Sequence, residues 1–149
     1  MIKGGSMAAK RIVVGVDGSE ESKRALRWAA RQAQLVGAEL ELITAWDIPV
    51  TFGVPVYADD VDLADAARQV LQETVAEVLG ERPAVPVRPT VVQGQPARAL
   101  VEASKDAELL VVGSRGRGGI VGALLGSTSD YCIRHAKCPI VVLHGDRDA

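Results

Sequence analysis

The sequence predicts an α/β fold, an open five-stranded parallel sheet with helices on both faces. Short runs of Val, Ile and Leu alternate with longer segments of helical periodicity, which is typical of repeated βα units joined by right-handed crossovers. The apolar content is 48% but aromatic residues make up only 3%, so the core must be built from Val, Leu, Ile and Ala, as in buried parallel strands. A chain of 149 residues has the size of one domain.

The first half of the chain contains two expected strands and the helix between them. The first strand covers Arg11–Val16 and ends at a turn, Asp17-Gly18-Ser19. The helix that follows should stop at Gly37, because glycine is favoured just beyond helix C-termini. The second strand, Glu39–Trp46, leads into a long connection at residues 47–60. This connection is compatible with a lid over a ligand, or with a cover for the sheet or for a partner subunit.

The second half continues the alternation and completes the sheet. Expected helices cover residues 64–78, Arg98–Lys105 and Ser127–Ala136, and expected strands cover Val87–Val92, Glu108–Val112 and Pro139–His144. Pro89 cannot donate a ladder hydrogen bond, which places the third strand at a sheet edge. With the fifth strand at the other edge, the strand order becomes 3-2-1-4-5. It reverses between strands one and four, and ligands of such sheets bind at this switch point.

Composition argues against several kinds of partner and location. The formal net charge of −2 provides no basic surface for nucleic acid or an anionic membrane. The apolar runs are far shorter than the ~20 residues that span a bilayer. Two cysteines, Cys132 and Cys138, fit a reducing compartment, so we expect a cytoplasmic protein. Residues 1–9 are interpreted as a leader, 10–145 as the domain and 146–149 as a charged tail.

The segment Gly113–Ser127 carries the strongest functional signal. Its six glycines stand at 113, 116, 118, 119, 122 and 126. Glycine lets backbone N–H groups approach an anion and permits the positive φ angles of anion-binding nests. Because Gly126-Ser127-Thr128 opens a helix, we expect free N–H groups, hydroxyls and the positive dipole end to converge on a phosphate, with charge added by Arg115. The segment is neither a P-loop, because no Lys precedes Ser127, nor G-x-G-x-x-G, because Val occupies position 121.

The spacing Gly113-x2-Gly116-x9-Gly126-Ser127 resembles the G-x2-G-x9-G-[ST] pattern of the nucleotide-binding universal stress proteins. The resemblance covers Lys10–Leu143. It includes Ile-Val-Val-Gly-Val-Asp-Gly-Ser at the start, Val-Gln-Gly-Gln-Pro after the third strand, Val-Val-Gly-Ser-Arg-Gly after the fourth, and Cys-Pro-Ile-Val-Val near the end. Some members of the family lack the glycine pattern and bind no ATP. Because this sequence contains the pattern, it resembles the nucleotide-binding branch of the family. The implied fold is Rossmann-like, of the adenine nucleotide α-hydrolase-like type.

The resemblance implies an adenine nucleotide as ligand, either ATP, AMP or cyclic AMP, with Mg²⁺ possible beside ATP. Asp17, with Gly15 and Val16 beside it, would contact the adenosine, and the backbone of Ala45 would meet the adenine edge. The residues implied for ribose and phosphates are Gly113, Arg115, Gly116, Gly126, Ser127 and Thr128. Position 115 is His in some members, which leaves a side-chain role for Arg115 open. The family also implies a homodimer, which would pair the apolar edge Ile140–Leu143 across a two-fold axis.

Structural explanations stay open for parts of this site. Asp17 could serve as a turn acid or helix N-cap. Ser127 and Asp130 fit a capping box. The glycines could merely form a flexible loop.

Two further features have a functional and a structural interpretation. Cys132, His135 and Cys138 suggest a metal site, but zinc needs four ligands and His144 would lie at the far end of a strand, so a buried thiol and surface groups are favoured. Trp46 could flank a base, although core packing is favoured for an aromatic residue at a strand end.

Three functions follow from these observations. The leading hypothesis is a non-catalytic nucleotide-binding protein that senses or buffers a nucleotide during stress. The second is a slow ATPase or ATP-using transferase, although Asp17 is the only acid clearly placed at the predicted site, so no catalytic residue and no metal ligand is assigned. The third is a dimeric interaction module in which the nucleotide is only structural.

Overall fold

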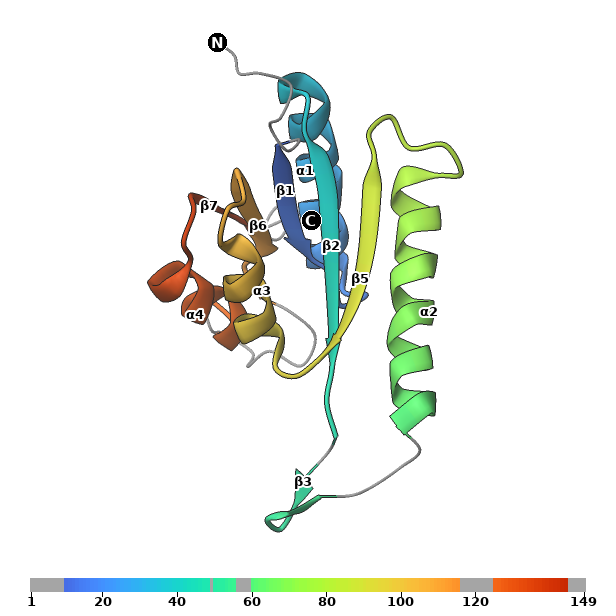
Figure 1. Ribbon diagram of the computed structural model, residues 1–149, viewed down its shortest axis with the longest axis vertical. Helices are drawn as coiled ribbons and strands as arrows, with labels where there is room; N and C mark the ends of the chain where they lie inside the picture. Colours follow the sequence, from blue (N-terminus) through green and yellow to red (C-terminus); the bar gives the residue numbers. More distant parts are fainter. Residues whose placement is uncertain (1–9, 49, 56–59, 116–124, 145–149) are drawn as a thin grey trace.

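A five-stranded parallel sheet forms the centre of the computed structural model, which describes residues 10–48, 50–55, 60–115 and 125–144 (Figure 1). The strand order is β5-β2-β1-β6-β7. The strands are β1 (Arg11–Gly15), β2 (Glu39–Trp46), β5 (Val87–Gln93), β6 (Leu109–Gly113) and β7 (Ile140–Leu143). Numbered along the chain, these five strands have the order 3-2-1-4-5, which confirms the prediction. The interpretations made for residues 1–9 and 146–149 concern parts of the chain outside the described residues.

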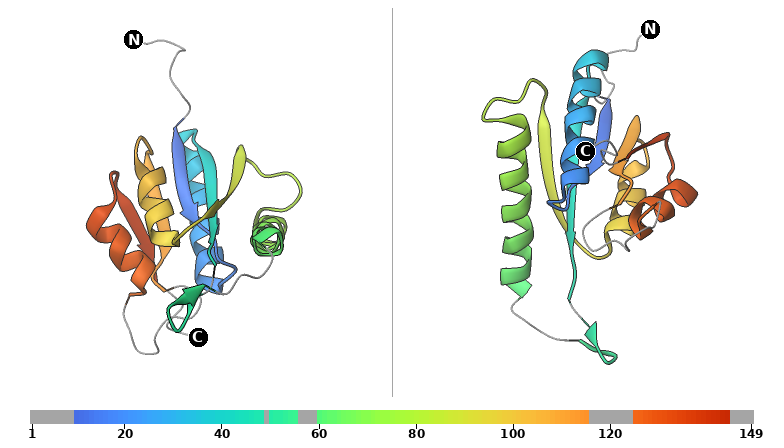
Figure 2. Two further views of the ribbon diagram at one scale, coloured as in Figure 1. Left: turned by 60° about the horizontal axis from the view of Figure 1, so that its bottom comes forward. Right: turned by 180° about the vertical axis from the view of Figure 1, so that it is seen from behind.

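Helices cover both faces of the sheet (Figure 2). In the described part of the chain these are α1 (Glu20–Val36), α2 (Asp60–Leu79), α3 (Pro96–Ser104) and α4 (Ser127–His135). The first two pack on one face, and α3 and α4 pack together on the other. The sheet is therefore the middle of three layers, as the alternation of strands and helices predicts.

The core is divided by the sheet into two clusters. Successive side chains of β1 point to opposite faces, so Ile12 and Val14 pack beneath α1 and α2 while Val13 packs toward α3 and α4. All three side chains are fully buried. Burial on both faces explains why β1 and β6 contain continuous apolar runs without polar alternation.

Helix α1 has well-defined ends. The Ser19 side chain accepts a hydrogen bond from the backbone N–H of Ser22 and caps the N-terminus. Gly37 ends the helix with φ of 72°, which confirms the predicted stop. Lys23 in the first turn contacts Glu20 at 3.1 Å and Glu77 of α2 at 3.0 Å, and these hydrogen bonds raise the pKa of the Lys23 ammonium.

The two sheet edges follow from the sequence. Pro89 lies in β5, opposite Leu42 of β2, and β5 has no neighbour on its other side in the described sheet, as Pro89 predicted. Strand β7 forms the other edge. All four of its residues are half-buried.

The connection after β2 contains a small hairpin that the sequence analysis did not predict. Strands β3 (Val50–Thr51) and β4 (Val54–Pro55) pair antiparallel, with Phe52 and Gly53 between them at φ angles of 52° and 76°. Two successive positive φ angles are the signature of a type I′ turn. Phe52 is 99% exposed at the tip. Figure 1 shows the hairpin projecting beyond the end of the sheet.

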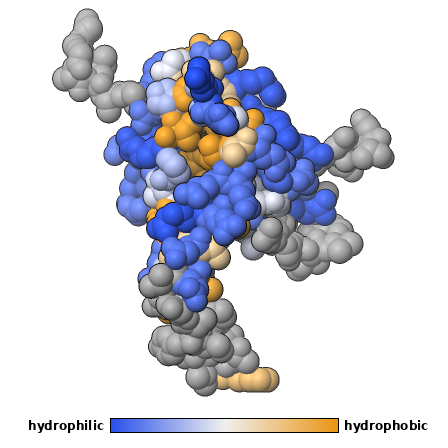
Figure 3. Space-filling view, turned by 90° about the vertical axis from the view of Figure 1, so that its right-hand side faces the viewer, coloured by the Kyte–Doolittle hydropathy of each residue, from blue (hydrophilic) through white to orange (hydrophobic). Residues whose placement is uncertain are grey.

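The face that α2 presents is mostly polar (Figure 3). Figure 3 shows the side on which α2 lies, where hydrophilic side chains surround a smaller apolar area. Among the described residues, no helix is both long and apolar enough to cross a bilayer.

Candidate functional site

A pocket of about 320 Å³ lies at the ends of β1 and β6, where the strand order reverses. Nine of the ten residues predicted for the site line it: Gly15, Val16, Asp17, Ala45, Gly113, Arg115, Gly126, Ser127 and Thr128. The tenth, Gly116, is outside the described residues. The volume falls at the small end of the range for small-molecule sites, ~300–1,000 Å³.

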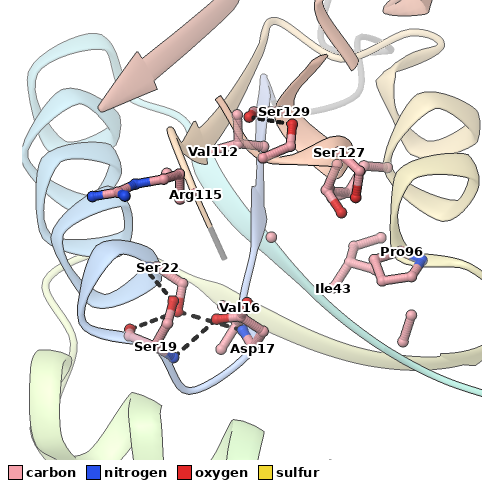
Figure 4. Close-up of a pocket in the computed structure, with 16 residues that line it drawn as sticks. Val16, Asp17, Ser19, Ser22, Ile43, Pro96, Val112, Arg115, Ser127 and Ser129 are labelled. Atoms are coloured by element: carbon pink, nitrogen blue, oxygen red, sulfur yellow. Dashed lines mark hydrogen bonds between the residues drawn. The ribbon is translucent and has the colours of Figure 1, made fainter. Parts of the chain in front are cut away.

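Asp17 forms the turn between β1 and α1. Its Oδ1 accepts a hydrogen bond from the backbone N–H of Ser19 at 2.9 Å, and its own N–H donates to Ser22 Oγ at 3.4 Å (Figure 4). The proposed turn role of Asp17 is therefore present, but Ser19 rather than Asp17 is the N-cap of α1. Because these bonds fix the turn, the half-buried Asp17 side chain is held at the pocket wall.

The wall on the β2 side is set by contacts with the end of β1. Val16 donates its N–H to the carbonyl of Ile43, and its carbonyl accepts from the Thr44 hydroxyl at 2.8 Å. Backbone groups alternate in direction along a strand, so those of Ala45 face the same side as those of Ile43. Since β1 has ended at Gly15, the Ala45 backbone N–H and carbonyl face the space where the pocket lies.

The wall on the β6 side joins two segments that flank the glycine-rich loop. The carbonyl of Ser114 accepts from the N–H of Gly126 at 2.6 Å and from the hydroxyl of Ser129 at 2.7 Å. Ser114 and Ser129 are each 2% exposed. The two ends of the loop are therefore pinned together by buried hydrogen bonds, and the start of α4 is fixed against the end of β6.

The N-terminus of α4 faces the pocket without a side-chain cap. Gly126 is the N-cap residue, and its carbonyl accepts from Asp130 N–H at 3.0 Å. The capping box predicted for Ser127 and Asp130 is wrong, because Ser127 is already the first helical residue and Asp130 pairs with Arg134. The N–H groups of Ser127 and Thr128, at the start of the helix, have no intrahelical acceptor, and both residues line the pocket.

Glu21 is the residue near the site that the sequence analysis missed. Its Oε1 accepts from the backbone N–H of Arg115 at 2.6 Å and from the Ser114 hydroxyl at 3.0 Å. Its Oε2 lies 3.7 Å from Arg115 Nε. The first turn of α1 thus holds the start of the glycine-rich segment. A Cβ on Gly113 would lie 2.9 Å from Glu21 Cβ, which is a packing reason for that glycine.

The apolar part of the pocket was also missed. The additional lining residues are Ser19, Ser22, Ile43, Pro96, Leu100, Val112 and Ser129. Four of them are apolar, and Ile43 of β2 forms, with Pro96 and Leu100 of α3, an apolar wall suited to a flat ring. The signal for them was the Val-Gln-Gly-Gln-Pro segment, which places Pro96 at the start of α3.

Other candidate residues lie elsewhere. Cys132 is fully buried, and burial raises the pKa of its thiol to about 11. Cys138 is half-buried, and both cysteines are free. No group of three metal-ligating side chains occurs among residues 10–48, 50–55, 60–115 and 125–144. Trp46 is half-buried and is absent from the described lining, as are the described residues of the connection that follows it.

These features define a class, namely a doubly wound parallel α/β protein with a ligand pocket at its switch point, between a strand-end acid and an uncapped helix start. The universal stress protein family model matches residues 8–144. The chain belongs to the universal stress protein family.

Individual relatives agree with this assignment. A universal stress protein of Mycolicibacterium smegmatis is 38% identical over 93% of this chain and 49% of its own length, so this chain spans about half of that relative. Universal stress protein MJ0531 of Methanocaldococcus jannaschii is 30% identical over 96% of this chain and 86% of its own length. A universal stress protein crystallised in complex with cAMP is 29% identical, with a TM-score of 0.70 over 94% of this chain and 100% of that chain.

Proposed function

We propose that this chain binds an adenine nucleotide, ATP, AMP or cyclic AMP, in the pocket between β1, β6 and α4. The observation that carries the proposal is the uncapped start of α4, which lies at a pocket that also contains Asp17. The relative crystallised with cAMP supports an adenine nucleotide as the ligand class.

Each wall suits one part of such a ligand. The adenine lies against Ile43, Pro96 and Leu100, and its polar edge meets the backbone of Ala45. Asp17, beside Gly15 and Val16, accepts hydrogen bonds from the adenosine. Ribose and phosphates lie against the residues of the glycine-rich segment and the start of α4: Gly113, Arg115, Gly116, Gly126, Ser127 and Thr128.

Affinity in this arrangement must come from several contacts together. A charge at a helix N-terminus contributes only about 0.3–1 kcal/mol, whereas micromolar affinity requires about 8 kcal/mol. Burial of the base against the apolar wall supplies a further part, at roughly 25 cal/mol for each Å² of apolar surface removed from water. Mg²⁺ would enter with ATP, coordinated by the phosphates.

At the level of the cell, we propose that nucleotide occupancy makes the protein a sensor or buffer in the stress response. The protein would act in the cytoplasm as a homodimer that pairs the β7 edges, Ile140–Leu143, across a two-fold axis. Support for this pairing is the position of β7 at the edge of the described sheet.

Calorimetric titration of nucleotide-free protein with ATP, ADP, AMP and cyclic AMP tests the binding proposal. We expect saturable binding of at least one of them, and competition between them for one site. Native mass spectrometry of the protein as purified would show the mass of a retained ligand. Absence of heat and of competition with every one of these nucleotides would refute the proposal.

A further inference from the structure

We propose that Glu21 sets how the site discriminates between nucleotides with one phosphate and nucleotides with three. It would do so by neutralising Arg115 at the start of the glycine-rich segment. This inference rests on the proposed function, because it concerns the selectivity of the same pocket.

The contacts of Glu21 are directed at the loop and not at solvent. Its side chain is 15% exposed, and its two oxygens contact the backbone N–H of Arg115, the hydroxyl of Ser114 and the guanidinium of Arg115. Figure 4 shows the Arg115 side chain extending toward α1 and away from Ser127. The carboxylate therefore holds both the backbone and the charge of Arg115.

Glu20, the acid next to Glu21, serves as a comparison because it makes no hydrogen bond or ion pair with the described residues of the glycine-rich segment. Glu20 occupies the same turn of α1, is 74% exposed, and pairs with Lys23 three residues along the helix. A negative charge at a helix N-terminus is accounted for by the dipole alone. Glu21 differs because Gly113 lets α1 approach β6 closely enough for the carboxylate to reach across the strand end.

The contact between Glu21 and Arg115 matters for phosphate binding because few charged side chains line the described pocket. Among the described residues that line the pocket, Arg115 is the one Lys or Arg. With Glu21 at 3.7 Å from its Nε, the loop start carries almost no net charge, and attraction for phosphate depends mainly on backbone N–H groups. Each additional phosphate then gains little Coulomb energy, so affinity rises weakly from AMP to ATP. Without the carboxylate, the free guanidinium would favour the more highly charged ligand.

The experiment compares ATP and AMP affinities of four variants with those of the wild type by calorimetry, at low and at high ionic strength. Glu21→Gln keeps an oxygen acceptor for the Arg115 N–H and removes the charge. Arg115→Gln removes the cation, and the double variant removes both. Glu20→Gln is the matched control, because it removes one acid from the same helical turn. Circular dichroism establishes that each variant is folded.

We expect the two single variants to shift the ratio of ATP affinity to AMP affinity in opposite directions. In Glu21→Gln the ratio of ATP affinity to AMP affinity rises by on the order of fivefold, the effect of one charge in partly screened surroundings, and the rise shrinks at high ionic strength. In Arg115→Gln the ratio falls below the wild-type value, because the carboxylate is then unpaired. The double variant returns close to wild type, and Glu20→Gln changes the ratio less than twofold.

Two results would overturn the proposal, and they differ from failure of the binding function. An unchanged ATP-to-AMP ratio in a folded Glu21→Gln protein would show that the charge of Glu21 is not felt by the ligand. A ratio shifted in the same direction by both single variants would show a purely structural effect on the loop. If the wild type binds neither ATP nor AMP, this inference fails, and the titrations with ADP and cyclic AMP decide separately whether the proposed function fails as well.

Discussion

Replacing Gly113 with Ala should destabilise the fold, because the end of β6 lies against the first turn of α1. An added Cβ would lie 2.9 Å from the Cβ of Glu21 and 3.1 Å from both the carbonyl carbon and the carbonyl oxygen of that residue. Two of these three atoms belong to the backbone, so rotation of a side chain cannot relieve the contact. Ordinary contacts between carbon atoms begin near 3.5 Å, so α1 must move by roughly 0.5–1 Å.

The magnitude follows from what that movement disturbs. Overpacking a well-packed core costs about 1–3 kcal/mol. The displacement also stretches the hydrogen bond from Arg115 N–H to Glu21, which is 2.6 Å long. We therefore expect a loss of about 2 kcal/mol in the free energy of unfolding for Gly113→Ala. For a domain of this size the corresponding fall in Tm is about 4–8 °C.

Gly15→Ala provides the matched control, because it makes an equally short contact with a different kind of atom. Its added Cβ would lie 2.9 Å from Leu100 Cδ1, the end of a rotatable side chain. A rotation of Leu100 relieves most of that contact, so we expect a loss below about 1 kcal/mol.

Urea unfolding of both variants at one protein concentration measures the midpoint and the m-value. The protein concentration is fixed because an oligomer's stability depends on it. If Gly113→Ala proves as stable as Gly15→Ala, with an unchanged m-value, α1 does not constrain position 113 and the packing explanation is wrong.

Three further predictions concern the ligand, the thiols and the sheet edge. Gly126→Val and Ser127→Ala should each weaken nucleotide binding while circular dichroism and oligomer size stay unchanged. The loss should be about tenfold or more for valine, because its side chain fills pocket space. Wild-type affinity in both variants would place the phosphates elsewhere. Burial raises the pKa of Cys132 from 9.0 to about 11, so the thiol of the unfolded chain loses its proton at a lower pH than the thiol of the folded protein. Up to roughly 2 kcal/mol of the free energy of unfolding should therefore be lost between pH 9 and 11. A Cys132→Ser variant that loses just as much over that interval would contradict this cause. The carbonyls of Pro139 and Leu143 accept from Leu110 and Ser114, so the backbone N–H of Val142 between them points away from β6, toward the open edge. Val142→Pro removes that donor and should convert a dimer to a monomer by light scattering with little loss of stability, whereas a dimer that persists would exclude pairing through this edge.

The fold was predictable because its signals are local. Pro89 placed the third strand at one edge, and with the fifth strand at the other edge the order 3-2-1-4-5 followed. Parallel strands direct their carboxyl ends to one edge, so the order brings the turn after β1 beside the segment after β6. For that reason residues as distant in sequence as Asp17 and Ser127 could be assigned to one pocket.

The features that escaped prediction depend on contacts between distant segments or on the exact register of a helix. The Glu21 contact with Ser114 joins residues 93 positions apart, and no local pattern marks it. The capping-box pattern at Ser127 was met by the residue types, yet α4 starts one residue earlier than a Ser127 cap requires. The hairpin at Phe52-Gly53 was missed because Phe is an uncommon residue at a position with positive φ.

Gly113 and Gly126, which flank the glycine-rich loop, are needed for different physical reasons. Gly113 allows α1 to approach β6, so its substitution disturbs the fold before it disturbs a ligand. Gly126 caps α4 at a φ of −79°, which any residue can adopt, so there the absence of a side chain leaves open space at the pocket. Loss of nucleotide binding in a Gly113 variant would therefore say little about phosphate contacts. Loss of binding in a folded Gly126 variant would bear directly on them.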